Sequence, residues 1–205
     1  MLHQNEFLLW YFKRFVSYRH IKPTAVHHWL ADTQLVTQNI DGLDGKAGNA
    51  TYVPIHRRLA KVTVLHKQGR DVPLMDAPWE EVAAACDDLD DSLRLTPILL
   101  DAFKISKKTL TPDPMFSLKP FVLLFDEYYT DLYRMSEAED WMQNVQRIVF
   151  MGTSFSVNIT SIALRTALTN KAAIEVFDPQ PNDLGCERIE YHRTTAAEYV
   201  SDRSG

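Results

Sequence analysis

The sequence contains few cysteines, no excess of positive charge and no long hydrophobic run. Only two cysteines occur in 205 residues, Cys86 and Cys186, and neither belongs to a C-x-x-C pair. This excludes a disulfide framework and a zinc site made of four thiolates. Cysteine usage of this kind is typical of a reducing compartment, so we expect a cytoplasmic protein.

The charge and the hydropathy pattern exclude two classes of partner. A formal net charge of −5 and a pI near 5.8 provide no positive field for nucleic acid or anionic lipid. The apolar runs at 121–125 (FVLLF) and 148–152 (IVFMG) have the length of strands, far below the roughly 20 residues that cross a bilayer. The first residues, MLHQNEFLLWYFKRF, lack a basic leader and are expected to be folded protein.

The order of the expected elements predicts an α/β fold. Apolar residues at helical spacing predict a helix over 6–18, and Pro23 suits the first turn of a second helix. From 118 onward, buried apolar runs alternate with helical patterns, as in a parallel sheet with right-handed crossovers. The strands expected there cover 121–125, 147–151, 173–177 and 187–191.

The middle of the chain differs from the rest in composition. The region from 69 to 114 is rich in Asp and Pro and contains one helical piece around 79–86. At 205 residues the chain is long enough for one core and short for two domains. We therefore expect one domain over 1–205, with a divergent insertion or small subdomain over 66–115.

Polar residues follow three of the expected strands or turns, where ligands bind in doubly wound sheets. Residues 37–43 (TQNIDGL) offer amides and a carboxylate and lead into a glycine-rich loop over 41–48, although an Asx-rich turn is an alternative interpretation. His56 could accept a proton near neutral pH. Residues 152–154 (GTS) could bind ribose or phosphate oxygens, or simply cap the next helix.

Taken together and in order, three segments resemble the sirtuin family of NAD-dependent protein deacylases. PTAVHHWLADTQLVTQNIDGLDGKAG at 23–48 is similar to the family's Thr-Gln-Asn-Ile-Asp-Gly-Leu region. LKPFVLLFDE at 118–127 resembles its Leu-Arg-Pro-x-Val-Val-x-Phe-Gly-Glu strand, and FMGTSFSV at 150–157 resembles its Gly-Thr-Ser-x-x-Val turn. The resemblance covers roughly residues 6–200, apart from the middle region.

The resemblance implies a fold, a cofactor and a reaction. The fold would be the Rossmann-like, doubly wound parallel sheet of the sirtuin large domain, with NAD as cofactor and no zinc in the small subdomain. The family's first strand and its glycine-rich turn have no counterpart before Glu6. Since that turn holds the diphosphate, we expect impaired catalysis unless a partner chain supplies the segment or the sequence is a truncated or alternative-start product.

The resemblance also implies roles for individual residues. His56 would be the general base toward the nicotinamide ribose, with Asn39 and Asp41 also in catalytic positions. Gln38, Asn39 and Asp41 would line the nicotinamide and ribose pocket, and Gly152, Thr153, Ser154 and Asp178 would hold the adenosine side. Val122, Leu123, Leu124 and Phe125 would contact an acyl-lysine protein or peptide by β-augmentation.

Three functions are compatible with these residues. The first is an NAD-dependent protein-lysine deacylase, which releases nicotinamide and transfers the acyl group to ADP-ribose. The second is an NAD glycohydrolase, in which water replaces the acyl oxygen. The third is a non-catalytic module that binds NAD or another protein, which the missing glycine-rich turn favours.

Overall fold

The computed structural model describes residues 4–65, 73–86, 88–124 and 127–203. The helices are α1 (Gln4–Tyr18), α2 (Ala25–Trp29), α3 (Leu43–Lys46), α4 (Trp79–Ala85), α5 (Ser92–Ala102), α6 (Met135–Asn144), α7 (Asn158–Thr169) and α8 (Ala196–Ser201), with a 3-10 turn η1 (Asp131–Tyr133). The strands are β1 (Val36–Thr37), β2 (Val53–Pro54), β3 (Arg57–Val64), β4 (Met75–Asp76), β5 (Leu118–Val122), β6 (Arg147–Met151), β7 (Ala173–Phe177) and β8 (Ile189–His192).

The strands form two parallel groups and one antiparallel group. β6, β7 and β8 form a parallel sheet in that order, with Val149 opposite Glu175 and Glu175 opposite Glu190. β1 pairs with β2 in parallel, and β3 lies between β4 and β5 in an antiparallel sheet. Together with the crossover helices, this confirms the predicted Rossmann-like α/β class.

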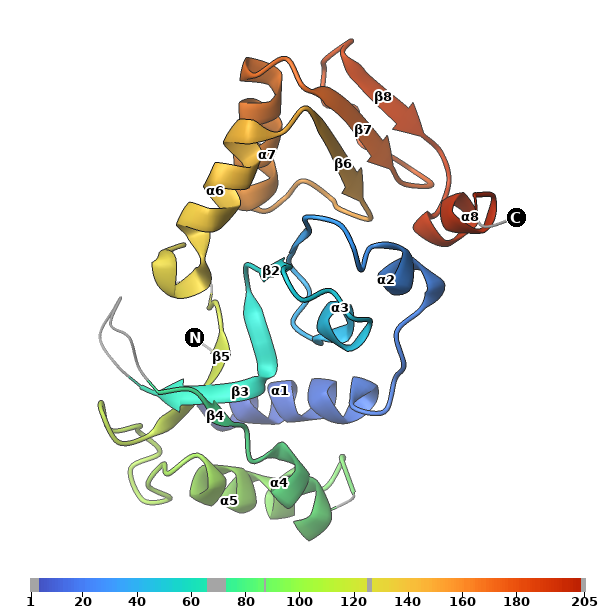
Figure 1. Ribbon diagram of the computed structural model, residues 1–205. Coiled ribbons are helices and arrows are strands. Elements are labelled where there is room, and N and C mark those ends of the chain that lie inside the picture. Colours follow the sequence, from blue (N-terminus) through green and yellow to red (C-terminus); the bar gives the residue numbers. More distant parts are fainter. Residues whose placement is uncertain (1–3, 66–72, 87, 125–126, 204–205) are drawn as a thin grey trace.

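Two hydrophobic clusters hold the chain together. One joins α1, α4, α5, β3 and β5 around Trp79, which is fully buried against Phe103. The other joins β2, α6, α7 and the sheet of β6, β7 and β8. In Figure 1 that sheet stands at one end of the molecule, with α6 and α7 beside it, while α4 and α5 lie at the opposite end beyond α1.

The strand predicted at 121–125 has a different position and partner. The structure places β5 at Leu118–Val122 and pairs it antiparallel with β3, not within a parallel sheet. All five residues of β5 are buried, because its sheet packs into the cluster around Trp79 and Phe121 stacks on Tyr133. A continuous apolar run indicates that a strand is buried on both faces, but it does not indicate the direction of the strand. The prediction that this strand belongs to a parallel sheet was therefore wrong.

Two helices were absent from the sequence prediction. The glycine-rich stretch at 41–48 contains a single turn, α3, and the left-handed angles of Gly42 (φ 75°) and Gly48 (φ 104°) flank it. α5 forms although Pro97 lies inside it. At the start of α5, the Asp91 side chain accepts a hydrogen bond from the backbone N–H of Arg94. Packing of the buried face of α5 offsets the loss of the backbone hydrogen bond at Pro97.

The described part of the middle region packs against α1. Residues 66–72 of the predicted insertion over 66–115 lie outside the described residues. Its described helices α4 and α5 contribute Trp79, Val82 and Leu95 to the same cluster as α1. No helix in the described part of the chain combines the length and apolar character needed to cross a membrane.

Candidate functional site

A cavity of about 880 Å³ lies between β1 and β6. The ends of both strands contribute to its wall, so it contains Gln38 and Asn39 from one side and 152–154 from the other. The structure thus brings together five of the residues predicted to bind a cofactor. Its size falls within the usual range for pockets that bind small molecules and cofactors.

The turn after β6 exposes polar atoms toward this cavity. Gly152 adopts a left-handed angle (φ 60°), and the exposed Ser154 hydroxyl lies 2.7 Å from that of Ser156. The N-cap of α7 is Val157, which makes no side-chain cap, so the alternative that residues 152–154 cap this helix is wrong. The hydroxyls of Thr153 and Ser154 can therefore bind further partners in the cavity.

The segment that follows β1 carries an exposed amide at Asn39, and helix α3 beyond it carries a buried carboxyl. The backbone N–H of Asn39 donates to the Thr37 hydroxyl (3.2 Å), and the Asn39 side chain is exposed at the cavity. Asp44 lines the same cavity and is only 4% exposed. Burial raises the pKa of the Asp44 carboxyl, and the charge of His27 opposes this. No sequence pattern signalled this buried carboxyl, because burial of a single Asp follows from tertiary packing.

Asp41 lies in a second cavity of about 430 Å³ rather than with Asn39. Its Oδ1 accepts the backbone N–H of Leu43 at 2.9 Å. This is the Asx turn that the sequence offered as an alternative interpretation, and it fixes the start of α3.

His56 lies between β2 and β3, beside the tip of β1. Its Nε2 is 2.9 Å from the Tyr129 hydroxyl, and the two rings stack with centroids 6.0 Å apart. Burial lowers the pKa of His56 below its ordinary 6.5, and a hydrogen bond to the backbone of Gln38 partly opposes this. His56 lines neither of the two cavities, but Gln38 links it directly to the larger one. Tyr129, the partner of His56, was missed because the two residues lie 73 positions apart.

Of the remaining predicted site residues, those that the structure describes line neither cavity. Asp178 follows β7, and its Oδ1 accepts the backbone N–H of Gln180 at 2.8 Å. Val122 is buried in the ladder with β3, while the N–H of Leu123 donates to the His56 carbonyl (3.2 Å). The N–H of Leu124 donates to Glu127, and Phe125 lies outside the described residues. The predicted peptide segment therefore begins next to His56.

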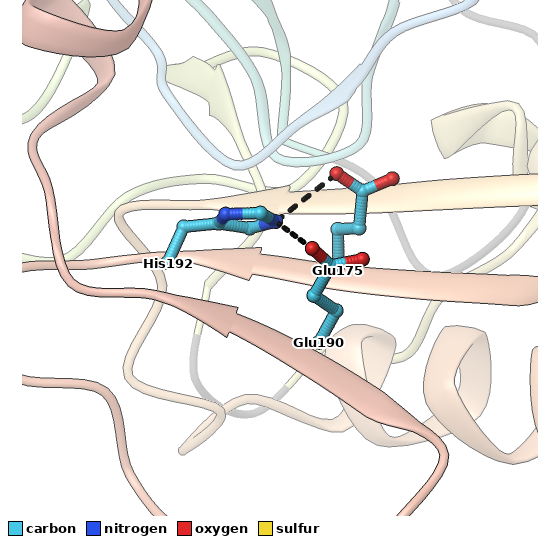
Figure 2. Close-up of side chains that lie close together, drawn as sticks. All are labelled: Glu175, Glu190 and His192. Carbon is cyan, nitrogen blue, oxygen red and sulfur yellow. Dashed lines mark ion pairs between the residues drawn. The ribbon is translucent and has the colours of Figure 1, made fainter.

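One group of potential metal ligands occurs among the described residues. Figure 2 shows Glu175 on β7 with Glu190 and His192 on β8, their side chains converging on one side of the sheet. The His192 Nε2 lies 3.2 Å from Glu175 and 3.4 Å from Glu190. The Glu175 carboxylate also accepts a hydrogen bond from the Arg147 guanidinium, at 2.5 Å. The cation beside Glu175 favours an ion-pair network over metal binding, because Arg147 already neutralises one carboxylate.

A parallel α/β sheet with a cavity at its strand tips defines the class of Rossmann-like proteins. Comparison with known proteins gives the family: the Sir2 family model matches residues 2–159, and the chain belongs to this family. This confirms the resemblance inferred from the three segments of the sequence.

Individual relatives agree with the family assignment. The NAD-dependent deacetylase sir2E of Dictyostelium discoideum is 30% identical over 136 residues, which cover 62% of this chain and 36% of that protein. The chain thus spans about a third of the length of this relative.

Solved structures share the fold. A Sir2–p53 peptide–NAD⁺ complex matches with a TM-score of 0.69 and 16% identity, over 98% of this chain and 76% of the other. A Sir2 homolog–NAD complex matches with a TM-score of 0.68 and 19% identity, over 97% and 70% of the two chains.

Proposed function

We propose that this protein is a sirtuin-type, NAD-dependent protein-lysine deacylase. The observation that carries the proposal is that the tips of β1 and β6 line one cavity and that His56 bonds to Gln38 in that cavity's wall. The family relatives support NAD as cofactor and an acyl-lysine peptide as substrate, since one is named an NAD-dependent deacetylase and one structure contains NAD⁺ with a p53 peptide.

The residues of the cavity fit a dinucleotide. Amides of Gln38 and Asn39 can hold a carboxamide and ribose hydroxyls on the β1 side. The backbone of Gly152 and the hydroxyls of Thr153 and Ser154 can hold the adenosine side. When bound, NAD supplies the ribose carbon that receives the acyl oxygen as nicotinamide leaves.

Asp41 and Asp178 remain predicted ligands of the cofactor. In the structure each carboxylate accepts an N–H of its own turn. A carboxylate oxygen has more than one lone pair, so each can also accept a ribose hydroxyl.

His56 is suited to the role of general base. If the imidazole donates one N–H to the Gln38 carbonyl, the neutral tautomer leaves Nε2 as the acceptor, facing the Tyr129 hydroxyl. The lowered pKa keeps the ring neutral at physiological pH. Nε2 can then take a proton from a ribose hydroxyl that displaces Tyr129 as its partner.

The test is to incubate the purified protein with NAD, with and without an acetyl-lysine peptide, and to measure free nicotinamide. Release that depends on the peptide, with loss of the acetyl group, supports a deacylase. Release without the peptide would identify an NAD glycohydrolase instead. Absence of release together with absence of NAD binding by calorimetry would leave a non-catalytic module.

The pH dependence of the reaction should follow His56. Because the base must be neutral and burial lowers its pKa, we expect kcat/KM to decline on the acid side with a midpoint below pH 6.5. The measurement is a pH profile of nicotinamide release from about pH 5 to about pH 9. A midpoint above pH 6.5 would show that another group, or a raised histidine pKa, controls the reaction.

A further inference from the structure

The smaller cavity, of about 430 Å³, shares no lining residue with the larger one. Its walls come from α3 and the residue before it, from the segment that precedes β2, and from the beginning of β3. Figure 1 shows α3 beside the first part of β3. A cavity of this size accommodates a small molecule, and the function proposed above uses only Asp41 of its lining residues.

Two cations line this cavity from different elements. The Arg58 guanidinium carbon lies 4.9 Å from the centroid of the Tyr52 ring, and in the described part of the chain this guanidinium has no hydrogen bond or ion pair. Lys46 of α3 makes one long hydrogen bond, from its Nζ to the Arg19 carbonyl at 3.4 Å. Most N–H donors of both side chains are therefore available to a ligand.

The charges around the cavity favour an anion. Asp41 is the acidic residue among those that line it, and its Oδ1 already accepts the backbone N–H of Leu43. Asp44 also lies in α3, but it lines the larger cavity, and burial raises the pKa of its carboxyl. One carboxylate against the two cations leaves the smaller cavity with a net positive charge.

Tyr52 adds a buried hydroxyl that has no acceptor. Tyr52 lines the cavity and is only 2% exposed, and its backbone is bonded on both sides, to Asn49 Oδ1 at 2.9 Å and to the Arg134 guanidinium at 2.8 Å. In the described part of the chain its hydroxyl has no hydrogen-bond partner, and the nearby backbone N–H of Gly45 can at most donate to its oxygen.

This hydroxyl is a donor at neutral pH. Burial raises the pKa of Tyr52, and the charge of Arg58 opposes this only in part, so the hydroxyl keeps its proton. Buried polar groups in folded proteins are normally paired. The free proton of Tyr52 therefore points to an acceptor that a ligand supplies, next to two cations.

We propose that the cavity between α3 and β3 binds the phosphoryl group of a small phosphorylated compound. The Arg58 guanidinium can donate to two oxygens at once, while Lys46 and Tyr52 donate from other directions. A phosphoryl group presents its oxygens in a tetrahedral arrangement that matches such donors, whereas the two oxygens of a carboxylate lie in one plane. The remaining volume leaves room for the organic part of the compound. This inference rests on the smaller cavity and not on the proposed activity.

Titration with inorganic phosphate, in the absence of NAD and at constant ionic strength, tests the proposal. The readout is the backbone amide chemical shifts of the isotope-labelled protein. We expect saturable changes at Gly45, Lys46 and Ala60, which line the cavity, and about tenfold weaker binding of acetate. Equal binding of the two anions, no saturable change, or saturable changes confined to residues 152–154 of the larger cavity would overturn the proposal.

Three variants make the test specific. Arg58→Gln alters an exposed side chain, so the fold should persist, and it should bind phosphate about tenfold more weakly. Tyr52→Phe keeps the ring beside Arg58 and removes only the hydroxyl, so we expect about fivefold weaker binding. Lys108→Gln, the matched control, removes an exposed cation that lines neither cavity and should leave the affinity unchanged.

The Arg58 variant decides between the outcomes. Circular dichroism checks the fold of each variant, and Arg58→Gln remains informative if the buried substitution at Tyr52 unfolds the protein. Unchanged phosphate affinity in Arg58→Gln, or an equal loss in Lys108→Gln, would contradict a site at this cavity.

Discussion

Replacing His56 by alanine should lower the rate of nicotinamide release by about 100-fold or more, as expected for loss of a general base. In the structure the imidazole bonds to the backbone of Gln38 and to the Tyr129 hydroxyl, and no ion pair in the described part of the chain depends on it. The loss should therefore appear in the reaction and not in the fold. The measurement is release from NAD and acetyl-lysine peptide, with the melting temperature as a check.

Two variants make this test specific. His28→Ala removes an exposed histidine of α2 that lines neither cavity, so it should react at the rate of the unmodified protein. Tyr129→Phe keeps the stacked ring but removes the hydroxyl beside Nε2, and it should change the pH profile more than the maximal rate. Full activity of His56→Ala would remove the histidine from the mechanism.

Replacing Trp79 by alanine should lower the free energy of unfolding by about 3–5 kcal/mol. The indole is fully buried, lies 4.6 Å from the ring of Phe103 and 6.2 Å from that of Phe12, and donates its Nε1–H to the Leu59 carbonyl at 2.8 Å. The substitution would therefore leave a large cavity and an unpaired carbonyl. Urea unfolding followed by circular dichroism measures the loss.

Trp10→Ala is the matched control for this prediction. Trp10 lies in α1, is 45% exposed and contacts the Arg14 guanidinium, 3.7 Å from the ring centroid. Its removal should cost about 1 kcal/mol or less. Similar losses for the two variants would show that the cluster around Trp79 is not the principal core of this half of the chain.

Local patterns predicted the parts of the fold that depend on neighbouring residues. The mainly apolar segments at 147–151 and 173–177 became β6 and β7 with the predicted bounds, because each is short and is followed by a polar turn. The helix around 79–86 was likewise found, as α4. The direction of β5 was not, since the choice between parallel and antiparallel pairing depends on its partner β3, which lies far earlier in the chain.

In the candidate site too, local patterns predicted some features and missed those that depend on contacts distant in sequence. Asn39, Asp41, His56 and Ser154 were predicted around one cavity because the ends of parallel strands meet at one edge of a sheet, but the structure places only Asn39 and Ser154 of these four there, together with Gln38. Asp41 is only two positions from Asn39, yet its turn directs it into another cavity. The pairing of His56 with Tyr129 and the burial of Asp44 arise from contacts distant in sequence, which no local pattern reports.

The central claim is that the tips of β1 and β6 form a single site for NAD next to His56. The most direct measurement is a titration of the isotope-labelled protein with NAD, followed by backbone amide chemical shifts. We expect saturable changes at Asn39 and across residues 152–154, with smaller changes at His56. Saturable changes confined to other parts of the chain, or no change at any NAD concentration, would contradict the claim.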